Sequence, residues 1–396
     1  MSGRWASPLS ARLSNLPRRP LYVSKIREMT LATKGALKMT SGEPDFPTPA
    51  HIKEAAKKAL DDGYTYYTSS AGLPEFVDSV VAHHREGGVD LKRGQVLVTA
   101  GAIEGLFLAM VGILEKGDQC IIPDPGYIAY EALVGFAEAE AVPVGVDRST
   151  FNLTAEAIEK KVTRKTKLVV LNSPSNPTGG VIPPGELKNI VELCKERRFA
   201  ILSDEAYEKI VYDGRVAQSL LDYPEISDRV IVAKSLSKTY SMTGWRVGYL
   251  LGDEKLVRPL TSLQAYVVLA VSAMAQKAGA AALGGPQDSV KTMVDEFHRR
   301  RELIVSRLNA IPGVKCPVPA GAFYAFPDVE EFGMGSFEMS EHLLKEGKVG
   351  VYPGVGFGRR GEGRIRLSFA TSRENIEEAA RRIGGALKKL SGGRAK

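Results

Sequence analysis

The sequence predicts an α/β protein: a large domain with a mostly parallel sheet covered by helices on both faces, and a smaller α+β domain. Two observations support this prediction. From about residue 95 onwards, short apolar runs alternate with segments whose apolar residues recur at helical spacing. The runs are apolar throughout rather than at every second position, which is typical of strands buried on both faces. Strands that are each followed by a helix favour parallel pairing.

Six apolar runs are expected to be the strands of this sheet, and they are 95–100, 119–122, 141–144, 167–172, 199–204 and 229–235. A helix is expected after the first of them, through Leu114, and another over 184–197. The longest apolar stretch, 264–285, is interrupted by polar and charged side chains. Because a membrane helix needs ~18 uninterrupted apolar residues, we expect a buried helix over this stretch and no membrane segment.

The pattern changes after about residue 285. A long charged helix is expected over 289–310, and GAFYAF (321–326) and RIRLSF (364–369) follow it. This indicates the second, smaller domain, which the N-terminal segment is expected to join. The predicted organisation has three parts: a large domain over 46–284, a small domain over 13–45 together with 285–396, and a basic N-terminal arm over 1–12.

The chain has 396 residues and a formal net charge of +7, and its two ends carry this charge. Residues 1–27 and 388–396 hold basic side chains and no acidic one, so the body between them is slightly acidic. A folded basic groove is therefore not expected, and we exclude a nucleic-acid partner. The acid-free N-terminal segment resembles a transit peptide, but we favour its interpretation as a disordered basic arm. A secretory signal is not expected, because the segment contains no apolar run of the required length.

The three cysteines, Cys120, Cys194 and Cys316, are widely spaced and form no CxxC pair. The five histidines show no ligand spacing either. Neither a disulfide framework nor a metal site is expected from this usage, and a reducing, cytoplasmic location is favoured.

Polar residues follow four of the predicted strands. Gly101 follows the first strand, 172–176 and Asp204 follow two others, and 235–238 follows the last. In open α/β sheets, ligands bind at the carboxyl ends of the strands. These four segments are therefore expected to line one pocket.

The segment TAGAIEGL (99–106) places small residues where a strand gives way to a helix. The N–H groups of Gly101, Ala102 and Ile103 would face an anion there, helped by the helix dipole. A tight turn between a strand and a helix needs small residues as well, so both interpretations stay open.

One lysine, Lys238, lies in SLSKTYSMTGWR (235–246) among hydroxyl-bearing and small residues. In a desolvated, partly cationic pocket, a lysine loses its proton more easily and can form a Schiff base. If Ser235 and Arg246 face the same anion, the ligand carries both a phosphate and a carbonyl. Asp204 would then pair with a protonated ring nitrogen, unless it only caps a helix. Phosphate, carbonyl and pyridinium together describe pyridoxal phosphate.

Two further residues have a functional and a structural interpretation. The loop NSPSNPTGG (172–180) would project the Asn176 amide from a strand end, or would only make a turn. Tyr207, three residues after Asp204, would face the ligand or would only pack in an amphipathic segment.

Seven motifs of the chain are specific in combination. They are SGEPDF (41–46), YTSSAGLPE (67–75), PGYIAY (125–130), NSPSNPTG (172–179), SDEAY (203–207), SLSKTYSMTGWR (235–246) and RIRLSFA (364–370). With these motifs, the chain from about Leu13 to Leu390 resembles the class I aminotransferases of the pyridoxal-phosphate-dependent fold type I group.

The resemblance implies a role for each matched residue at the cofactor's ring. Lys238 resembles the lysine that forms the Schiff base with the cofactor. Asp204 would pair with the pyridine nitrogen and keep it protonated. Asn176 and Tyr207 would hydrogen-bond the ring's phenolic oxygen.

The remaining cofactor contacts are implied in the same way. Tyr127 would stack on the ring, with Ala206 against its opposite face. The phosphate would meet a set of backbone and side-chain donors, which are Gly101, Ala102, Ile103, Ser235 and Arg246. Tyr67 resembles the residue that reaches a phosphate across a dimer interface, which implies a homodimer with shared active sites.

For the substrate, the resemblance implies that Arg366 takes the α-carboxylate in a bidentate fork, assisted by the Gly42 backbone and by Asn176. One departure from the family matters. Some aspartate-preferring members have a lysine for the distal carboxylate at the position of Ile103. An apolar residue there favours neutral or aromatic amino acids over acidic ones.

The expected function is therefore transfer of an amino group between an α-amino acid and a 2-oxo acid, with 2-oxoglutarate as the acceptor that the resemblance implies. The alternative is a pyridoxal-phosphate-dependent lyase or synthase on the same scaffold, because a fold does not fix a reaction. A DNA-binding regulator of the same fold would carry an added winged-helix domain, and the chain has no room for one. Small molecules are thus the expected partners.

Overall fold

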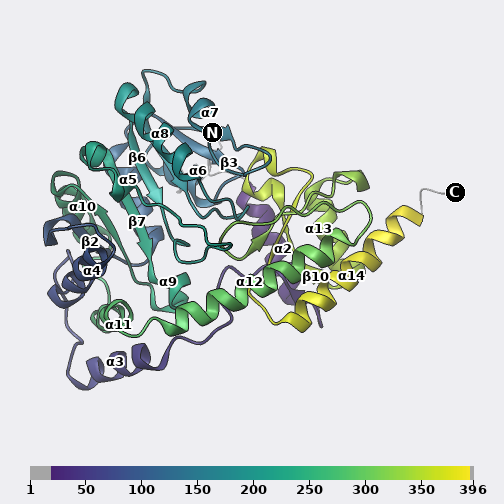
Figure 1. Ribbon diagram of the computed structural model, residues 1–396, viewed down its shortest axis with the longest axis horizontal. Helices are drawn as coiled ribbons and strands as arrows, with labels where there is room; N and C mark the ends of the chain where they lie inside the picture. The colour runs from purple at the N-terminus through teal and green to yellow at the C-terminus, as the bar shows by residue number, and fades with distance from the viewer. Residues whose placement is uncertain (1–18, 393–396) are drawn as a thin grey trace, which may run out of the picture.

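The computed structural model describes residues 19–392, and the basic arm predicted over 1–12 lies outside them (Figure 1). Its main feature is a seven-stranded sheet with the strand order β2-β8-β7-β6-β5-β3-β4. The strands are β2 (Val96–Thr99), β3 (Gln119–Asp124), β4 (Glu140–Gly145), β5 (Thr166–Asn172), β6 (Ala200–Asp204), β7 (Val230–Ser235) and β8 (Gly248–Gly252). Of these seven strands, β8 alone runs opposite to the others, so its pairings with β2 and β7 are antiparallel and the remaining pairings are parallel. The predicted mostly parallel sheet is confirmed.

The six predicted strands are all present, and β8 is the strand that was not predicted. Between β7 and β8 the chain forms only the short helix α9 (Leu236–Thr239) and the 3₁₀ turn η4 (Thr243–Trp245). No crossover helix separates the two strands, so β8 returns antiparallel to β7.

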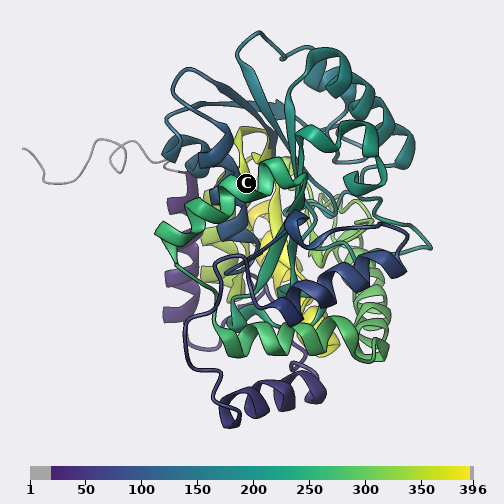
Figure 2. The same cartoon turned by 90° about the vertical axis from the view of Figure 1, so that its left-hand side faces the viewer.

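Helices cover both faces of the sheet, as predicted. One face packs against α4 (Pro74–Glu86), α8 (Pro184–Arg197) and α11 (Ala273–Gly284), and the other against α5 (Ala102–Ile113), α6 (Ala129–Phe136) and α10 (Glu254–Val267). Along β5, Val169 and Leu171 join the first apolar cluster, whereas Leu168 and Val170 join the second. This alternation explains why the strand is apolar at every position. The helix α3 (Ala50–Asp61) packs on α11, at the bottom of Figure 2.

The single buried helix expected over 264–285 is wrong. Helix α10 ends at Val267 and α11 begins at Ala273, after a break in which Leu269 has a φ of 65°. The Ser272 hydroxyl accepts the Ala275 N–H and so caps the new helix. The break contains no glycine or proline, which is why the sequence pattern gave no sign of it.

The other elements form a second apolar core. The strands are β1 (Leu37–Lys38), β9 (Tyr324–Ala325), β10 (Val349–Gly350), β11 (Tyr352–Pro353) and β12 (Ile365–Ser368), and the helices are α12 (Asp288–Asn309), α13 (Ser336–Gly347) and α14 (Arg373–Gly392). Helix α2 (Arg19–Ala32) packs beside this core in a smaller apolar cluster with Phe151, Phe326, Tyr352 and Phe357. Helix α12, the long charged helix that was predicted, runs between the two halves of the molecule in Figure 1. A short helix, α7 (Ala155–Glu159), precedes β5. The domain boundaries at residues 46 and 284 remain a prediction.

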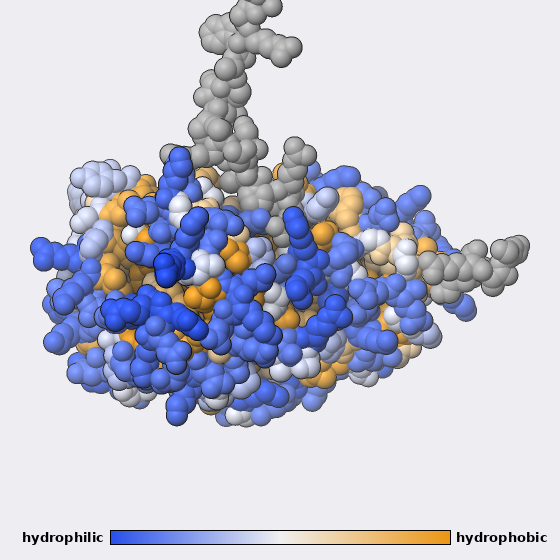
Figure 3. Space-filling view, turned by 90° about the horizontal axis from the view of Figure 1, so that it is seen from above, coloured by the Kyte–Doolittle hydropathy of each residue, from blue (hydrophilic) through white to orange (hydrophobic). Residues whose placement is uncertain are grey.

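The apolar residues of the described chain lie mainly in these cores. Seen from above Figure 1, the surface is mostly hydrophilic, with apolar side chains in scattered patches (Figure 3). Between residues 19 and 392, no helix combines the length and the apolar composition that crossing a membrane requires.

Candidate active site

A cavity of about 720 Å³ lies where the carboxyl ends of β5, β6 and β7 face the second core. Most of the predicted site residues line it, and they are Gly42, Ala102, Ile103, Tyr127, Asn176, Asp204, Ala206, Tyr207, Ser235, Lys238, Arg246 and Arg366. Gly101 does not line the cavity itself but lies in close contact with the Arg246 guanidinium, which does. Tyr67 does not line the cavity, and its side chain is 87% exposed. The structure thus brings together groups that lie far apart in the sequence, as the strand-end argument predicts.

Lys238 is held in the lining of the cavity by its local backbone. The Ser235 hydroxyl accepts the Ser237 N–H (3.2 Å) and caps α9, the single helical turn that carries the lysine. Lys238 Nζ donates to the Gly42 carbonyl oxygen at 2.6 Å. The contact joins the end of the large sheet to the 41–46 segment.

The environment of Lys238 favours its neutral form. Burial lowers its pKa to about 8, and the positive charges of Arg246 and Arg366 act in the same direction. The carboxylates of Glu43 and Asp204 oppose this shift. At neutral pH this lysine is therefore still mainly protonated, but a larger fraction than usual is the neutral amine, which is the nucleophilic form.

Asp204 ends β6 as a carboxylate that is only 5% exposed. Its Oδ2 accepts the Tyr130 hydroxyl at 2.7 Å, and its Oδ1 accepts the Ala206 N–H at 3.2 Å. Burial raises the pKa of Asp204 to about 6, although these hydrogen bonds oppose the rise. The residues after Asp204 form a turn and not a helix, so helix capping does not explain it. A cationic N–H in the cavity would stabilise the buried charge.

Tyr130 is a site residue that the sequence reasoning missed. It lies in the first turn of α6, three residues after Tyr127, which precedes the helix, and the two rings meet edge to face with their centroids 5.5 Å apart. Burial raises the pKa of Tyr130 well above its usual value and that of Tyr127 to about 12. Both hydroxyls therefore stay protonated, and that of Tyr130 acts as a fixed donor to Asp204.

Arg366 lies in β12 and is almost completely buried, at 4% exposure. Its Nη1 donates to Asn176 Oδ1 at 3.0 Å, and its Nη2 donates to the Thr40 carbonyl oxygen at 2.8 Å. Three aromatic rings surround the guanidinium, those of Tyr324, Tyr352 and Phe357. Its buried Nε has no partner within residues 19–392. A carboxylate in the cavity would supply the acceptor that this donor lacks.

Hydrogen bonds also fix the predicted ring-binding residues. The Asn176 N–H donates to Asn172 Oδ1 (2.9 Å), and Asn172 Nδ2 donates to the Asp204 carbonyl oxygen (3.0 Å), so the ends of β5 and β6 are tied together. The hydroxyls of Tyr207 and Tyr324 are 2.7 Å apart. Burial raises the pKa of both phenols, which therefore remain hydrogen-bond donors.

The N-terminus of α5 forms one side of the cavity. Gly101 has a φ of 79°, and its N–H already donates to the Thr99 carbonyl oxygen (2.7 Å), so the backbone amides that line the cavity are those of Ala102 and Ile103. A Cβ on Gly101 would lie 2.7 Å from Arg246 Nη2. Glycine is thus required here both by the backbone and by the close approach of the guanidinium.

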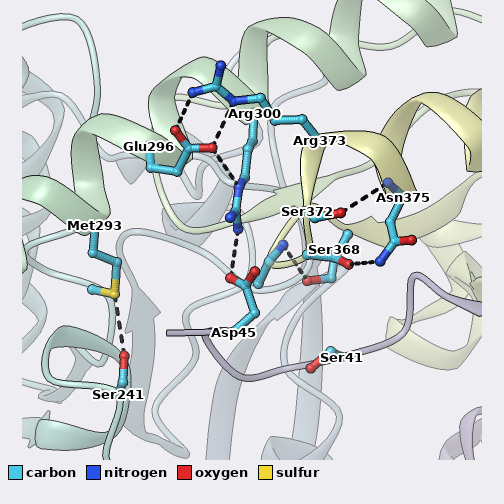
Figure 4. Close-up of polar contacts among 12 residues, drawn as sticks. Ser41, Asp45, Ser241, Met293, Glu296, Arg300, Ser368, Ser372, Arg373 and Asn375 are labelled. Carbon is cyan, nitrogen blue, oxygen red and sulfur yellow. Dashed lines mark hydrogen bonds and ion pairs between the residues drawn. The ribbon is translucent and has the colours of Figure 1, made fainter. Parts of the chain in front are cut away.

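An ion-pair network holds the 41–46 segment beside the cavity (Figure 4). Asp45 Oδ1 accepts Arg300 Nη1 of α12 at 2.7 Å. Glu296 accepts Arg300 Nε at 3.0 Å and Arg373 Nε of α14 at 2.9 Å. The network connects two helices of the second core to the segment whose Gly42 carbonyl accepts Lys238.

A second ionic cluster lies outside the cavity, next to the catalytic segments. Lys234 Nζ, 3% exposed, lies 2.6 Å from Glu205 Oε2 and also pairs with Glu208. Glu205 Oε1 accepts the hydroxyls of Ser203 (2.9 Å) and Ser219 (3.0 Å). Burial opposes the charge on Lys234, but the two carboxylates outweigh it and raise its pKa. The cluster fixes the chain on both sides of Asp204 and Ser235.

The donor set of the cavity fits pyridoxal phosphate. A pyridine aldehyde would find an aromatic ring, an amine of lowered pKa and a buried carboxylate in the cavity. Its phosphate would find backbone amides, a hydroxyl and a guanidinium. Arg366 lines the same cavity, so its guanidinium is available to a carboxylate beside that group.

Comparison with known proteins agrees with this chemistry. Residues 34–383 match the family model described as aminotransferase class I and II. An aspartate aminotransferase of Pyrococcus horikoshii is 39% identical over 92% of this chain and 94% of its own length, and an aromatic-amino-acid aminotransferase of Thermococcus litoralis is 37% identical over 93% and 96%. The structure of a Thermus thermophilus aspartate aminotransferase with maleate superposes with a TM-score of 0.89 and 32% identity, covering 96% of this chain and 100% of that one. The chain belongs to the aminotransferase class I and II family and is a pyridoxal-phosphate-dependent transaminase.

Proposed function

We propose that this transaminase moves an amino group from neutral or aromatic α-amino acids to 2-oxoglutarate, using the residues of the described cavity. One observation carries the proposal. A half-buried lysine of lowered pKa, a buried carboxylate and a buried guanidinium with an unsatisfied Nε face one cavity. An amine, an acid and an anion receptor are the groups that this reaction needs together.

Pyridoxal phosphate, when bound, supplies an aldehyde that condenses with amines and a ring that accepts electrons from the substrate's Cα. Asp204, oriented by Tyr130, would hold a proton on the ring nitrogen. Asn176 and Tyr207 would donate to the phenolic oxygen, while Tyr127 and Ala206 would confine the ring.

The phosphate would be bound by the Ala102 and Ile103 amides, with Ser235 and Arg246. Lys238 Nζ would take the proton from the substrate's Cα and return it, since its lowered pKa suits proton transfer near neutral pH. Arg366 would hold the α-carboxylate with its Nε.

The substrate's side chain would meet Ile103 and Tyr127, which offer apolar contact. Apolar pockets discriminate by only ~1–3 kcal/mol per methylene, so several neutral and aromatic amino acids should react. The relatives named above as aspartate and aromatic-amino-acid aminotransferases support a broad range.

An isotope experiment tests the reaction. The holoenzyme is incubated with ¹⁵N-labelled phenylalanine, leucine or aspartate together with 2-oxoglutarate, and ¹⁵N-glutamate is measured by mass spectrometry. We expect stoichiometric transfer from the neutral donors. A lyase or synthase would convert the amino acid without labelling glutamate. Aspartate exceeding every neutral donor by orders of magnitude would contradict the proposed preference.

We further propose that the active unit is a two-fold dimer that shares its sites. Large exposed apolar side chains on two segments support this proposal, namely those of Tyr66, Tyr67, Tyr266 and Leu269. A hydrogen bond from Gln264 Nε2 to the Ser70 carbonyl oxygen (2.8 Å) joins the two segments that carry them. Large apolar side chains that gather on the surface mark an interaction site.

The shared site gives a testable prediction. Tyr67→Ala and Lys238→Ala subunits, each inactive alone, should regain part of the activity when mixed, because one site of each hybrid dimer keeps both wild-type residues. Activity is measured after subunit exchange has been verified by native mass spectrometry. Full exchange without any regained activity would argue against Tyr67 serving the neighbouring subunit.

We also propose a cytoplasmic location. Cys120, Cys194 and Cys316 are all buried as unpaired thiols, which is the usage expected of a protein in a reducing compartment.

A further inference from the structure

Five cations are among the described residues that line the cavity, and the proposed function uses three of them. Arg246 serves the phosphate, Lys238 the reacting carbon and Arg366 the α-carboxylate. The remaining two are Arg27 and Lys38. Both are exposed, and neither forms an ion pair with another residue in the range 19–392.

Arg27 is directed to the cavity by the periodicity of α2. The residues of this helix that line the cavity are Val23, Ser24, Arg27, Thr30 and Leu31, a spacing that places them on one helical face. Val23 and Thr30 are buried beneath it. The face covers the mouth of the cavity with small and apolar side chains and a single guanidinium.

Lys38 reaches the same cavity from an extended segment. Lys38 and Thr40 line the cavity, whereas Met39 between them is buried in the second core, as alternation along extended chain requires. The Thr40 carbonyl oxygen accepts Arg366 Nη2 at 2.8 Å. Two residues span roughly 7 Å in extended chain, so the backbone of Lys38 lies close to the proposed α-carboxylate site without occupying it.

The acids that line the cavity leave these cations available. Glu43 accepts the Thr243 hydroxyl at 2.8 Å, and Asp204 lies at the end of β6 against Tyr130. Ile103 brings no charge to the site of the substrate's side chain. A dicarboxylic substrate bound through Arg366 would therefore leave its second carboxylate without a partner unless Arg27 or Lys38 supplies one.

We infer that Arg27 and Lys38 together bind the distal carboxylate of dicarboxylic substrates, whether 2-oxo acid or amino acid. The inference rests on the proposed function and extends it, because it explains how one cavity accepts both partners of the exchange. Neutral and aromatic side chains would stay against Ile103 and Tyr127, whereas an acidic side chain would extend to the two cations at the mouth.

A binding experiment on the holoenzyme tests this inference without turnover. Glutarate and valerate have the same number of carbons and differ in one terminal carboxylate. Their dissociation constants are measured by calorimetry for the wild type, Arg27→Gln, Lys38→Gln and the double variant. A charge-assisted hydrogen bond contributes about 10- to 100-fold in affinity. We expect glutarate binding to weaken about 10-fold in each single variant and about 100-fold in the double variant, with valerate changing less than about twofold.

Lys34→Gln is the matched control. It removes an equal charge from the same segment, is exposed and does not line the cavity. A similar loss of glutarate binding in this control, or an unchanged preference for glutarate over valerate in the double variant, would overturn the inference. Failure of the proposed function is distinguishable, because it would appear as absent ¹⁵N transfer while the two dissociation constants could still be compared.

Discussion

Replacing Lys238 by alanine is expected to abolish covalent attachment of pyridoxal phosphate and to lower transamination by at least about 10³-fold. The residue is the amine of lowered pKa in the cavity and also the group proposed to move the Cα proton, so one substitution removes both contributions. After borohydride reduction of the wild type, peptide mass mapping should locate the cofactor on Lys238. The variant should lose the visible absorbance of the bound cofactor after dialysis.

The control for this experiment is Lys188→Ala. Lys188 is exposed on α8 and does not line the cavity. This variant should keep both the reducible cofactor and the activity of the wild type. Reducible cofactor on any other lysine of Lys238→Ala would mean that the attachment site has been assigned to the wrong residue.

Asp204→Asn is expected to bind the cofactor but to lose about 10²- to 10³-fold in turnover, the usual effect of removing one preorganised electrostatic partner. An amide cannot hold a proton on the ring nitrogen as a carboxylate does, and a neutral pyridine is a poorer electron acceptor. Single-turnover kinetics with one amino acid measures this loss. Rates equal to those of the wild type would assign Asp204 a purely structural role.

The same substitution should stabilise the cofactor-free protein. The pKa of Asp204 is raised to about 6 in the fold, above its ordinary value of 3.8, so the folded state favours the protonated form. The free energy of unfolding therefore falls as the pH rises between these two values and stays reduced above them. Asparagine does not titrate, so above pH 6 the variant should gain roughly 1–3 kcal/mol. Denaturant midpoints of both cofactor-free proteins at pH 4 and pH 8 measure the gain, which should be absent at pH 4.

Much of the fold followed from local patterns. Apolar runs identified six strands of the large sheet, because a strand buried on both faces needs apolar residues at every position. The break between α10 and α11 was not predictable in this way. The positive φ at Leu269 is not preferred by leucine, so tertiary packing and not local propensity sets it.

In the candidate site, too, some features followed from local sequence and others depend on tertiary packing. Polar residues after the strands predicted where the cavity lies, and most of the expected residues line it. Their orienting partners are remote in the chain: Tyr130 reaches Asp204 across 74 residues, and Thr40 reaches Arg366 across 326. Such contacts depend on how remote segments of the chain pack against each other within each core, which no local pattern of one sequence specifies.

The ionic cluster of Lys234, Glu205 and Glu208 has a consequence for the alignment of the chain. Each member is the immediate neighbour of a cavity residue, namely Ser235, Asp204 and Tyr207. A shift of any of these segments by one residue would move a charged residue of the cluster into the cavity and a cavity residue into the cluster. The charges that remain in the cluster would then lack a partner. Since an isolated buried charge is strongly unfavourable, a one-residue insertion or deletion here would destabilise the fold. It would also displace the residues that line the cavity. The cluster thus fixes the register of these segments, and the register determines which side chains face the cofactor.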